Sequence, residues 1–399
     1  MRVGINCFFL QPHVGGMKHY VLNLLHLLLT GDTGNTYTLF CFPHNESVLA
    51  ERGADWWQQH AVVLDRIEQI REHLADIDVY FSPINGLQPL PLPPIPTVIT
   101  VPDVQESTYP QFFDPKELFY RDWYHRVSCQ LADQVITTSQ FSKKAIVQFY
   151  GAHEDRVAVI HPGIDERMYS GQIVGRKPQA ELPADYALYP GNRWRHKNHD
   201  ILMAAIRKLR RTYGMSVNLV CTGRDVEAGV RLRDIVRRYD IADLVYDLGY
   251  VTAEEMIYLY QRARLLVFPS LYEGFGMPLL EAMASGCPVV AAKETSLPEV
   301  AGDAALYFDP RDVDQVGEAI RQVWNNEKEG ASLSQLGRTR AQAFSPKDTV
   351  SAHLKAFERA RAQFSLSRYR FNMSLLYPYH LARVGAKRAL GVYGRQSHV

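Results

Sequence analysis

Short apolar runs alternate with amphipathic stretches along most of the chain. In the first part of the sequence, runs of strand length occur at residues 3–10, 37–42, 79–82, 97–101 and 134–139. Apolar positions with helical spacing lie between them, near residues 17–30, 66–75 and 115–132. This alternation is typical of βα units built around a parallel sheet.

The pattern stops between His161 and Asp185, where Gly and Pro gather as they do in a domain linker. Further on, strands are predicted at 186–190, 217–221, 244–249, 265–270 and 288–292. Helices are predicted near 197–213, 226–239 and 252–263. A chain of 399 residues exceeds the size at which one core keeps growing. We therefore predict an α/β protein with two doubly wound, Rossmann-like domains, whose ligand site lies beyond the carboxyl ends of the strands, in the cleft between the domains.

Composition narrows the class of protein. The 44 basic and 43 acidic side chains balance each other, which argues against a general nucleic-acid binder. Five scattered cysteines without a CxxC pair predict buried thiols in a reducing compartment. We recognise neither a signal peptide nor an apolar stretch of about eighteen residues, so a cytoplasmic protein without a transmembrane helix is expected.

The most informative stretch is residues 268–291, which read FPSLYEGFGMPLLEAMASGCPVVA. The glycines within 274–276 permit a tight turn after a strand. Pro278 suits the first position of a helix and Gly286 suits the position just past its end, so a helix is predicted over 278–285.

Two glutamates lie eight residues apart in this stretch. Glu273 falls in the loop before the predicted helix, and Glu281 falls in its first turns. Amides at a helix N-terminus bind phosphate, and neighbouring carboxylates accept hydrogen bonds from sugar hydroxyls, so a nucleotide-sugar would suit the site. Spacing alone also allows a simpler interpretation, in which Glu281 only complements the helix dipole and Glu273 is a solvated loop residue.

The stretch resembles the glutamate-x7-glutamate signature of the retaining GT-B glycosyltransferases of family 4, in the form EGFG-x-P-x-x-E-A-x-x-x-G-x-P-V. The similarity continues through 296–310 and covers roughly residues 1–360. It implies that Glu281 binds the ribose hydroxyls of a donor and that Glu273 contacts the transferred sugar beside its anomeric carbon. The other donor-binding residues that the resemblance implies in this stretch are Gly274, Phe275, Gly276 and Leu280.

The resemblance also sets the expected domain organisation. In the GT-B fold, two Rossmann-like domains face each other across a cleft, and a C-terminal helix crosses back to the first domain. The expected segments are an N-terminal acceptor domain at 1–170, a C-terminal donor domain at 171–345, the returning helix at 346–364 and a basic, aromatic tail at 365–399.

A Gly-Gly turn in HVGGMKHY joins the first strand to the first helix. Gly15 and Gly16 let the backbone approach a ligand closely, with a helix N-terminus behind them. Such a pair is often only a turn, but the resemblance places it in the loop that faces the donor phosphate and the acceptor.

A basic loop, YPGNRWRHKNHDIL, follows the first strand of the second domain. Fixed cations at a strand end stabilise the charge of a departing diphosphate, although a solvated basic loop would look the same. In the family an Arg and a Lys hold the diphosphate here. Lys197 matches the Lys; the Arg can be Arg193 or Arg195, and we choose Arg193.

Asp103 lies at the carboxyl end of a strand in TVPDVQESTYPQFF. Many relatives carry a histidine just before this aspartate, whereas this chain has Pro102. A front-face retaining reaction tolerates the change, because the departing phosphate oxygen can take the acceptor proton. Asp103 is a candidate for orienting the acceptor hydroxyl, or else caps a turn.

No metal-binding motif, P-loop or Ser elbow is recognised, so neither a metal nor a cofactor is expected and the nucleotide-sugar is a substrate. Residues 361–399 hold seven Lys or Arg and no Asp or Glu, among aromatics such as Tyr369 and Phe371. This tail could contact an anionic membrane surface, as a peripheral protein would on the inner face of the plasma membrane, or could be a terminal helix and a solvated tail.

The sequence thus predicts a metal-independent, retaining hexosyltransferase that uses a nucleoside-diphosphate sugar and a glycan or lipid-linked glycan acceptor. The segments around PDVQE and WRHKNHD look most like mannosyltransferases of bacterial surface-polysaccharide assembly, which favours GDP-mannose and leaves UDP-hexoses open. The alternatives are a nucleotide-sugar epimerase or phosphorylase of the same architecture and a non-catalytic nucleotide-sugar-binding protein.

Overall fold

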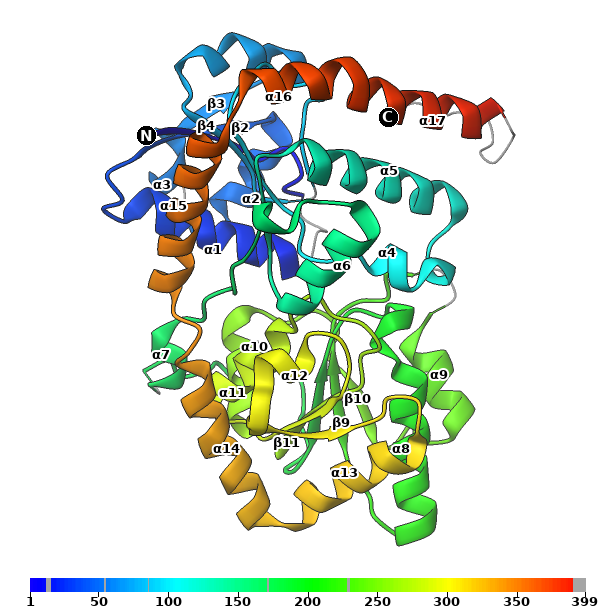
Figure 1. Ribbon diagram of the computed structural model, residues 1–399. Coiled ribbons are helices and arrows are strands. Elements are labelled where there is room, and N and C mark those ends of the chain that lie inside the picture. The colour runs from blue at the N-terminus through cyan, green and yellow to red at the C-terminus, as the bar shows by residue number, and fades with distance from the viewer. Residues whose placement is uncertain (12–15, 54, 85, 171, 228–229, 390–399) are drawn as a thin grey trace. The chain divides into compact units, whose positions relative to one another are not determined.

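The computed structural model describes residues 1–11, 16–53, 55–84, 86–170, 172–227 and 230–389. The chain forms two compact units (Figure 1). Unit 1 comprises Met1–His161 and Lys347–Val399, and unit 2 comprises Pro162–Pro346. The short helix α7 (Glu166–Tyr169) falls in unit 2, so this division comes earlier in the chain than the predicted boundary at 170.

Unit 1 contains a seven-stranded parallel sheet in the order β3-β2-β1-β4-β5-β6-β7. Its central strands β4, β5 and β6 are buried along their whole length, as expected of parallel strands that are covered on both faces. The strands are β1 (Arg2–Asn6), β2 (Thr36–Cys41), β3 (Ala61–Val63), β4 (Val79–Ser82), β5 (Thr97–Thr100), β6 (Gln134–Thr137) and β7 (Val157–Val159).

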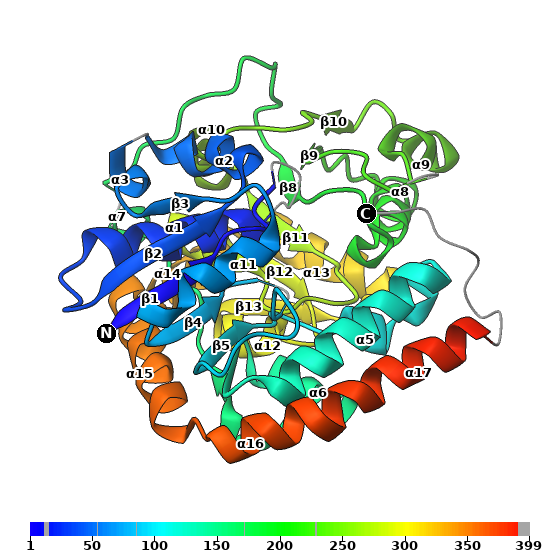
Figure 2. The ribbon, with the colours of Figure 1, turned by 90° about the horizontal axis from the view of Figure 1, so that it is seen from above.

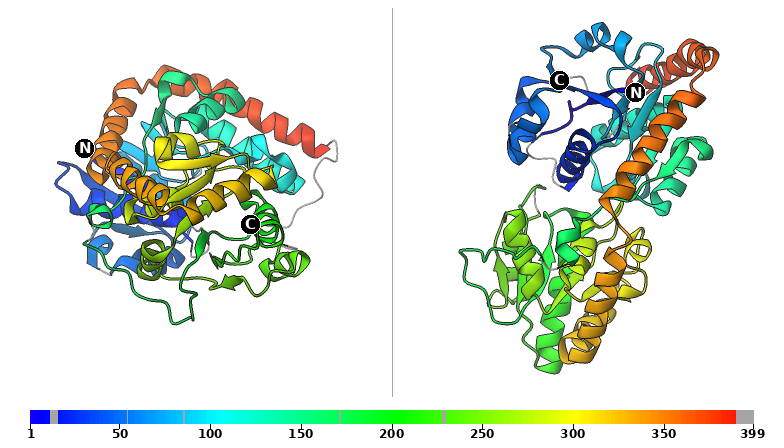
Figure 3. Two further views of the ribbon diagram at one scale, coloured as in Figure 1. Left: turned by 90° about the horizontal axis from the view of Figure 1, so that it is seen from below. Right: turned by 90° about the vertical axis from the view of Figure 1, so that its left-hand side faces the viewer.

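Helices and short 3-10 turns cover this sheet. The N-terminal helices are α1 (Gly16–Thr30), α2 (Glu46–Leu49), α3 (Asp55–Gln58), α4 (Gln105–Thr108), α5 (Pro115–Leu131) and α6 (Gln140–Tyr150). From the C-terminal part, α15 (Pro346–Gln363) returns to unit 1 (Figures 1 and 3). The centre of the Phe357 ring on this helix lies 5.1 Å from that of Phe81 on β4. It leads into α16 (Leu366–Phe371), a π-helical turn (Asn372–Leu376) and α17 (Tyr377–Ala389).

Unit 2 contains a six-stranded parallel sheet in the order β10-β9-β8-β11-β12-β13, which is the strand order of a Rossmann fold. The strands are β8 (Ala187–Pro190), β9 (Leu219–Thr222), β10 (Val245–Asp247), β11 (Leu265–Phe268), β12 (Val289–Ala292) and β13 (Ala305–Phe308). The remaining helices are α8 (His199–Tyr213), α9 (Leu232–Tyr239), α10 (Ala253–Arg262), α11 (Met277–Ser285), α12 (Leu297–Ala301), α13 (Val313–Asn325) and α14 (Glu327–Ala341).

The strand order reverses between β8 and β11, which pair at Ala187 and Leu265. The crevice outside the carboxyl ends of the strands at such a point is where open α/β sheets bind ligands. The loops that leave β8 and β11 begin there, and they carry Lys197 and Glu273. The fold class predicted from the sequence, two doubly wound parallel sheets, is confirmed.

Several local predictions need correction. The predicted helix near 66–75 is instead two 3-10 segments, Ile67–Glu72 and Leu74–Asp76, in which the buried Ile70 and Leu74 provide too few apolar positions for an α-helix face. The predicted helix at 226–239 begins only at Leu232. The cysteines are all buried and unpaired, as expected. Across the described ranges, no helix is long and apolar enough to cross a membrane.

Candidate functional site

The turn before α11 is shaped by Gly276, the residue that caps this helix. Its φ of 96° favours glycine, and a Cβ there would lie 2.7 Å from Leu297 Cδ2. The helix begins at Met277, has Pro278 in its first turn and ends at Ser285, just before Gly286, whose φ is 78°. The predicted helix is therefore confirmed to within one residue, and its N-terminal amides lie directly after the loop that carries Glu273.

Lys197 and Glu273 form the central ion pair of the site. The distance from Lys197 Nζ to Glu273 Oε1 is 2.5 Å, and the two side chains are only 14% and 12% exposed. The ammonium also lies 5.3 Å from the centre of the Phe268 ring, at the end of β11. The structure thus brings together two predicted site residues, one from the loop after β8 and the other from the loop after β11.

The backbone of Glu273 is fixed by residues that the sequence analysis missed. Its amide donates to Thr295 Oγ1 at 3.1 Å, and its carbonyl accepts a hydrogen bond from Ser296 Oγ at 2.9 Å. Both residues belong to the loop after β12. The sequence offered little signal for this role beyond two adjacent hydroxyl residues at the start of the 296–310 stretch.

Asn198 was also missed, although it fixes the position of Lys197. It adopts a left-handed conformation with φ 59°, which Asn tolerates better than most residues. Its Nδ2 donates to the carbonyls of Pro269, at 3.1 Å, and Pro310, at 2.8 Å. Asn198 therefore joins the loop after β8 to the segments that follow β11 and β13.

Glu281 lies in the second turn of α11 and is partly buried. Its Oε2 accepts a hydrogen bond from Tyr260 Oη at 2.9 Å. Burial raises the pKa of Glu281 to about 7, and the Tyr260 hydroxyl offsets only part of this effect. The carboxyl group thus titrates near neutral pH.

The two candidate arginines have different surroundings. Arg193 is 1% exposed, pairs with Asp247 at the end of β10, and lies 3.7 Å from an oxygen of Asp225. Its Nε and Nη1 have no hydrogen-bond partner among the described residues. Arg195 is 53% exposed and pairs with Glu227 at 2.6 Å. Arg193 thus retains buried donor capacity, whereas Arg195 lies on the surface.

Comparison with known families agrees with this geometry. Residues 176–340 match the family model of glycosyl transferases group 1, and residues 14–167 match the model of glycosyltransferase family 4. The O-antigen chain mannosyltransferase B of Escherichia coli is 32% identical over 271 residues, which span 65% of this chain and 70% of that protein. The chain belongs to the group 1 glycosyltransferases.

This glycosyltransferase is also similar to a second O-antigen mannosyltransferase and to two solved structures. The O-antigen chain mannosyltransferase RfbU of Salmonella typhimurium is 30% identical over 56% of this chain and 60% of that protein. The structure of Anabaena HepE with UDP and glucose aligns with a TM-score of 0.71 and 16% identity, over 90% of this chain and 99% of that one. A sucrose-phosphate synthase from Thermosynechococcus elongatus aligns with a TM-score of 0.70 and 19% identity, over 91% and 99%. At these identities the two structures support the fold alone.

The remaining predicted donor-binding residues of the glycosyltransferase are spread over both units. The side chains of Phe275 and Leu280 are buried in the core of unit 2. Gly274 stands between Glu273 and Phe275 in the sequence and is buried in the turn before α11. Gly16 begins α1 in unit 1, and Gly15 lies outside the described residues.

Asp103 lies in unit 1, in the loop after β5. Its Oδ1 accepts a hydrogen bond from the Gln105 amide at 3.1 Å, where α4 begins. The carbonyl of Pro102 accepts bonds from the hydroxyls of Thr137, at 3.3 Å, and Thr138, at 3.1 Å. The proline thus ties this loop to the end of β6.

Beneath this loop lies a buried polar network that the sequence did not reveal. Glu106 accepts hydrogen bonds from His125 Nδ1, at 2.7 Å, and from Tyr150 Oη. Burial acts to raise the pKa of Glu106, but the hydrogen bonds and charge of its neighbours outweigh it and leave that pKa lowered. The network fixes α4, and with it the segment that follows Asp103.

Two histidines lie beside the cations of unit 2. Burial lowers the pKa of His199 to about 3, and the charges of Arg193 and Lys197 act in the same direction. The pKa of His196 is lowered for the same reasons, burial first and then Lys197. Both rings are therefore neutral at physiological pH. Within the described residues, no group of three or more His, Cys, Asp or Glu is arranged to hold a metal ion.

Proposed function

We propose that the protein is a retaining mannosyltransferase that acts in surface-polysaccharide synthesis without a metal ion. It would transfer mannose from GDP-mannose to a hydroxyl group of a glycan or of a lipid-linked glycan. A lipid-linked acceptor would place the enzyme in the cytoplasm, at the inner face of the plasma membrane.

One observation carries the proposal: the Lys197–Glu273 pair at the point where the strand order of unit 2 reverses, beside the N-terminus of α11. A diphosphate at this point would face a fixed ammonium group and the helix amides, which together stabilise the charge that develops as the nucleotide leaves. The carboxylate of Glu273 would then accept hydrogen bonds from the sugar attached to that diphosphate.

Two further groups of unit 2 support the same assignment. Arg193 has two buried N–H positions without a hydrogen-bond partner among the described residues, which suits a second contact to the diphosphate. One carboxylate oxygen of Glu281 accepts a hydrogen bond from Tyr260. The carboxylate would also accept hydrogen bonds from the ribose hydroxyls of the donor.

In the proposed reaction, the bond between the anomeric carbon and the donor phosphate oxygen breaks, and a bond to the acceptor hydroxyl oxygen forms on the same face. The acceptor proton passes to the departing phosphate oxygen. This route needs no histidine at position 102, so Pro102 is compatible with activity. Asp103 would orient the acceptor hydroxyl.

The choice of mannose rests on the names of the relatives. Both O-antigen relatives are mannosyltransferases, and a third relative, from Mycolicibacterium hassiacum, is an MMP α-(1→4)-mannosyltransferase that is 28% identical. The structural neighbour HepE was crystallised with UDP and glucose, so a UDP-hexose is the main alternative donor.

A panel of nucleotide-sugars in a thermal-shift assay tests the donor. A ligand at 100 times its Kd stabilises the folded state by about 2.7 kcal/mol, which raises Tm by roughly 5–10 °C for a unit of this size. We expect GDP-mannose to give the largest shift. A larger shift with a UDP-hexose would identify that compound as the donor in place of GDP-mannose. No shift with any member of the panel would contradict the proposed donor site.

Activity measurements separate this function from its rivals. Isomerised donor would indicate an epimerase, and phosphate-dependent breakdown of a glycan would indicate a phosphorylase. Donor binding without release of nucleoside diphosphate, across a range of acceptors, would indicate a sensor that binds but does not transfer.

A further inference from the structure

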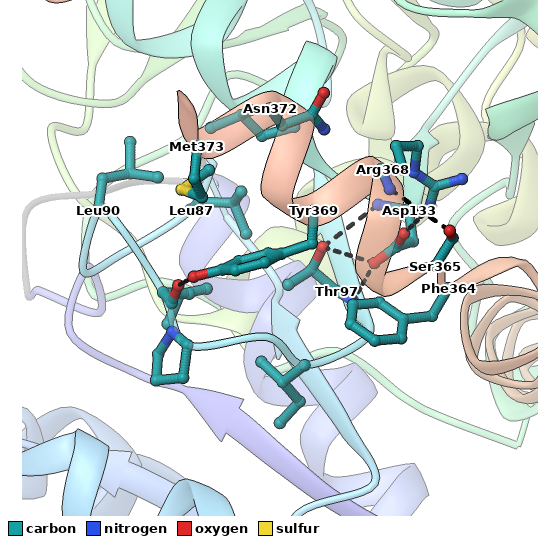
Figure 4. A pocket seen from close by; sticks show the side chains of 14 residues that line it. Leu87, Leu90, Thr97, Asp133, Phe364, Ser365, Arg368, Tyr369, Asn372 and Met373 are labelled. Carbon is teal, nitrogen blue, oxygen red and sulfur yellow. Dashed lines mark hydrogen bonds and ion pairs between the residues drawn. The ribbon is translucent and has the colours of Figure 1, made fainter. Parts of the chain in front are cut away.

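The C-terminal helices α16 and α17 are held against unit 1 in one orientation. Arg368 pairs with the buried Asp133, and Tyr369 Oη donates to the Leu92 carbonyl at 2.7 Å (Figure 4). Further along, His380 Nε2 lies 2.9 Å from Gln130 Oε1 on α5. Figure 2 shows α17 running beside α5. These contacts fix which side of the helices faces the protein and which faces solvent.

The solvent side of these helices is unusually apolar. We call it the outer face, and it consists of Leu366 (53% exposed), Phe371 (59%), Leu375 (59%), Tyr379 (57%) and Leu381 (45%). These are five of the thirteen exposed large hydrophobic side chains among the described residues, gathered within sixteen positions. Phe371, Leu375 and Tyr379 follow each other at intervals of four, which aligns them along one side of a helix. Such a concentration marks an interaction surface.

The C-terminal segment that contains these helices carries basic side chains and no acidic ones. The last acidic residue of the chain is Glu358, and basic residues follow at 359, 361, 368, 370, 383, 387, 388 and 395. Arg370 and Arg383 are exposed beside the outer face, and the guanidinium of Arg383 lies 5.9 Å from the centre of the Tyr379 ring. Exposed apolar and aromatic side chains flanked by arginines are the composition of a helix that lies in the interface of an anionic bilayer.

A second copy of the chain would fit the outer face less well than an anionic lipid surface would. A two-fold contact through the outer face would bring the same arginines of both copies together, with no acid in either segment to compensate them. Lipid phosphates would supply the missing negative charge.

We propose that the outer face docks on the surface of a membrane that contains anionic lipids. The leucines, Phe371 and Tyr379 would enter the boundary between headgroups and acyl chains, and Arg370 and Arg383 would pair with lipid phosphates. The helices would lie in the plane of the membrane. This docking does not depend on which sugar the enzyme transfers, because the outer face and the site around Lys197 belong to different units.

The test is sedimentation of the full-length protein with vesicles of phosphatidylcholine, with or without phosphatidylglycerol. We expect binding to the anionic vesicles that weakens at high salt. The double variant Phe371→Ser/Leu375→Ser should lower the partition coefficient on the order of tenfold or more, since two large apolar side chains no longer leave water. Arg370→Glu should lower it about fivefold.

Exposed residues of unit 2 provide the matched controls. Val174→Ser/Leu336→Ser removes comparable apolar side chains, and Arg233→Glu makes the same charge change on α9. Both controls should bind vesicles as the wild type does. A tail deletion is less informative, because Met373 and Tyr377 pack against the unit 1 core and their loss would expose it.

Three outcomes would overturn the proposal. The wild type could fail to sediment with anionic vesicles, or the double variant could sediment as the wild type does. Sedimentation velocity without vesicles could also show that the wild type self-associates and the double variant does not, which would assign the outer face to a second copy of the chain.

Discussion

The carboxyl ends of the two sheets carry charged residues of different accessibility. In unit 2, Lys197 and Glu273 meet where the strand order reverses, and each keeps part of its surface exposed. In unit 1, Glu106 and His125 are just as close but only 2% and 6% exposed. The first pair is the more exposed of the two, whereas the second is enclosed by α4, α5 and α6.

This difference separates the candidate donor site of unit 2 from the buried structural network of unit 1. Lys197 and Glu273 lie in the segments after β8 and β11, at the carboxyl ends of strands, whereas Glu106 and His125 lie on α4 and α5. The pair in unit 2 also lies beside the N-terminus of α11, which begins at Met277. We therefore propose donor chemistry for the residues of unit 2 and a positioning role, through α4 and the Asp103 loop, for the enclosed network of unit 1.

The largest expected effect is that of Lys197→Ala. Loss of the fixed ammonium should lower kcat about 10²–10³-fold, because it stabilises charge that develops only in the transition state. Steady-state kinetics would measure this, with Lys208→Ala, a 40% exposed lysine on α8, as the control. A kcat within threefold of the wild type would remove Lys197 from the reaction.

The next effect concerns the stability of unit 1. His125→Ala leaves the buried carboxylate of Glu106 without one of its two side-chain donors, so the free energy of unfolding should fall by about 3 kcal/mol. Thermal unfolding would show this, and the kcat of the folded protein should fall along with the stability, because the network positions the Asp103 loop. His153→Ala, at a 67% exposed position, is the control. A large loss of kcat without a loss of stability would mean that the network takes part in the chemistry.

Glu281→Gln should weaken donor binding about tenfold, because a neutral amide accepts hydrogen bonds from the ribose less strongly than a carboxylate. Since the pKa of Glu281 is raised to about 7, the wild-type affinity for the donor should rise as the pH passes through 7. Calorimetry from pH 6 to 8, values that span about one unit on each side of that pKa, should show this rise in the wild type and not in the variant.

The same carboxyl group affects stability with the opposite sign. A raised pKa means that the folded state binds the proton more tightly than the unfolded state does. The contribution is therefore fully present below the unfolded pKa and is lost as the pH rises through about 7. Between these values, wild-type stability should fall relative to Glu281→Gln by on the order of 1–3 kcal/mol. Denaturant titrations that show no divergence would contradict the buried environment of this group.

The smallest effect is expected at Arg195. Its guanidinium is 53% exposed and pairs with Glu227, so Arg195→Ala should change kcat and donor affinity by less than about threefold. Arg193→Lys, in contrast, replaces an enclosed guanidinium that pairs with Asp247 and should weaken both donor binding and stability. If Arg195→Ala is the more damaging variant, the arginine that contacts the diphosphate is Arg195 and not Arg193.

The sequence predicted the central strands and the α11 segment well, because long apolar runs and the Pro278 and Gly286 boundaries are local signals. It missed β3 and β7, the edges of the first sheet, and β13, an edge of the second. These strands have three or four residues and are not buried along their whole length, so their hydrophobic pattern is short and broken. Edge strands depend on their neighbours more than on their own residues.

The sequence predicted which residues belong to the candidate site, but not which of them contact each other. Lys197 and Glu273 are separated by 76 positions, and their pairing depends on how β8 and β11 lie side by side. For the same reason, nothing local in the sequence identified Tyr260 as the partner of Glu281 or Asn198 as a link between strand ends. The composition of the tail was visible in the sequence, but which of its residues face solvent was not.

The central claim is tested most directly by the product of the reaction. The protein is incubated with GDP-mannose and a mannosyl acceptor, GDP release is quantified, and the anomeric configuration of the new linkage is read by NMR. We predict one GDP for each mannose transferred and an α-linkage, which retains the configuration of the donor. A β-linked product, or donor consumption without any glycan product, would contradict the account.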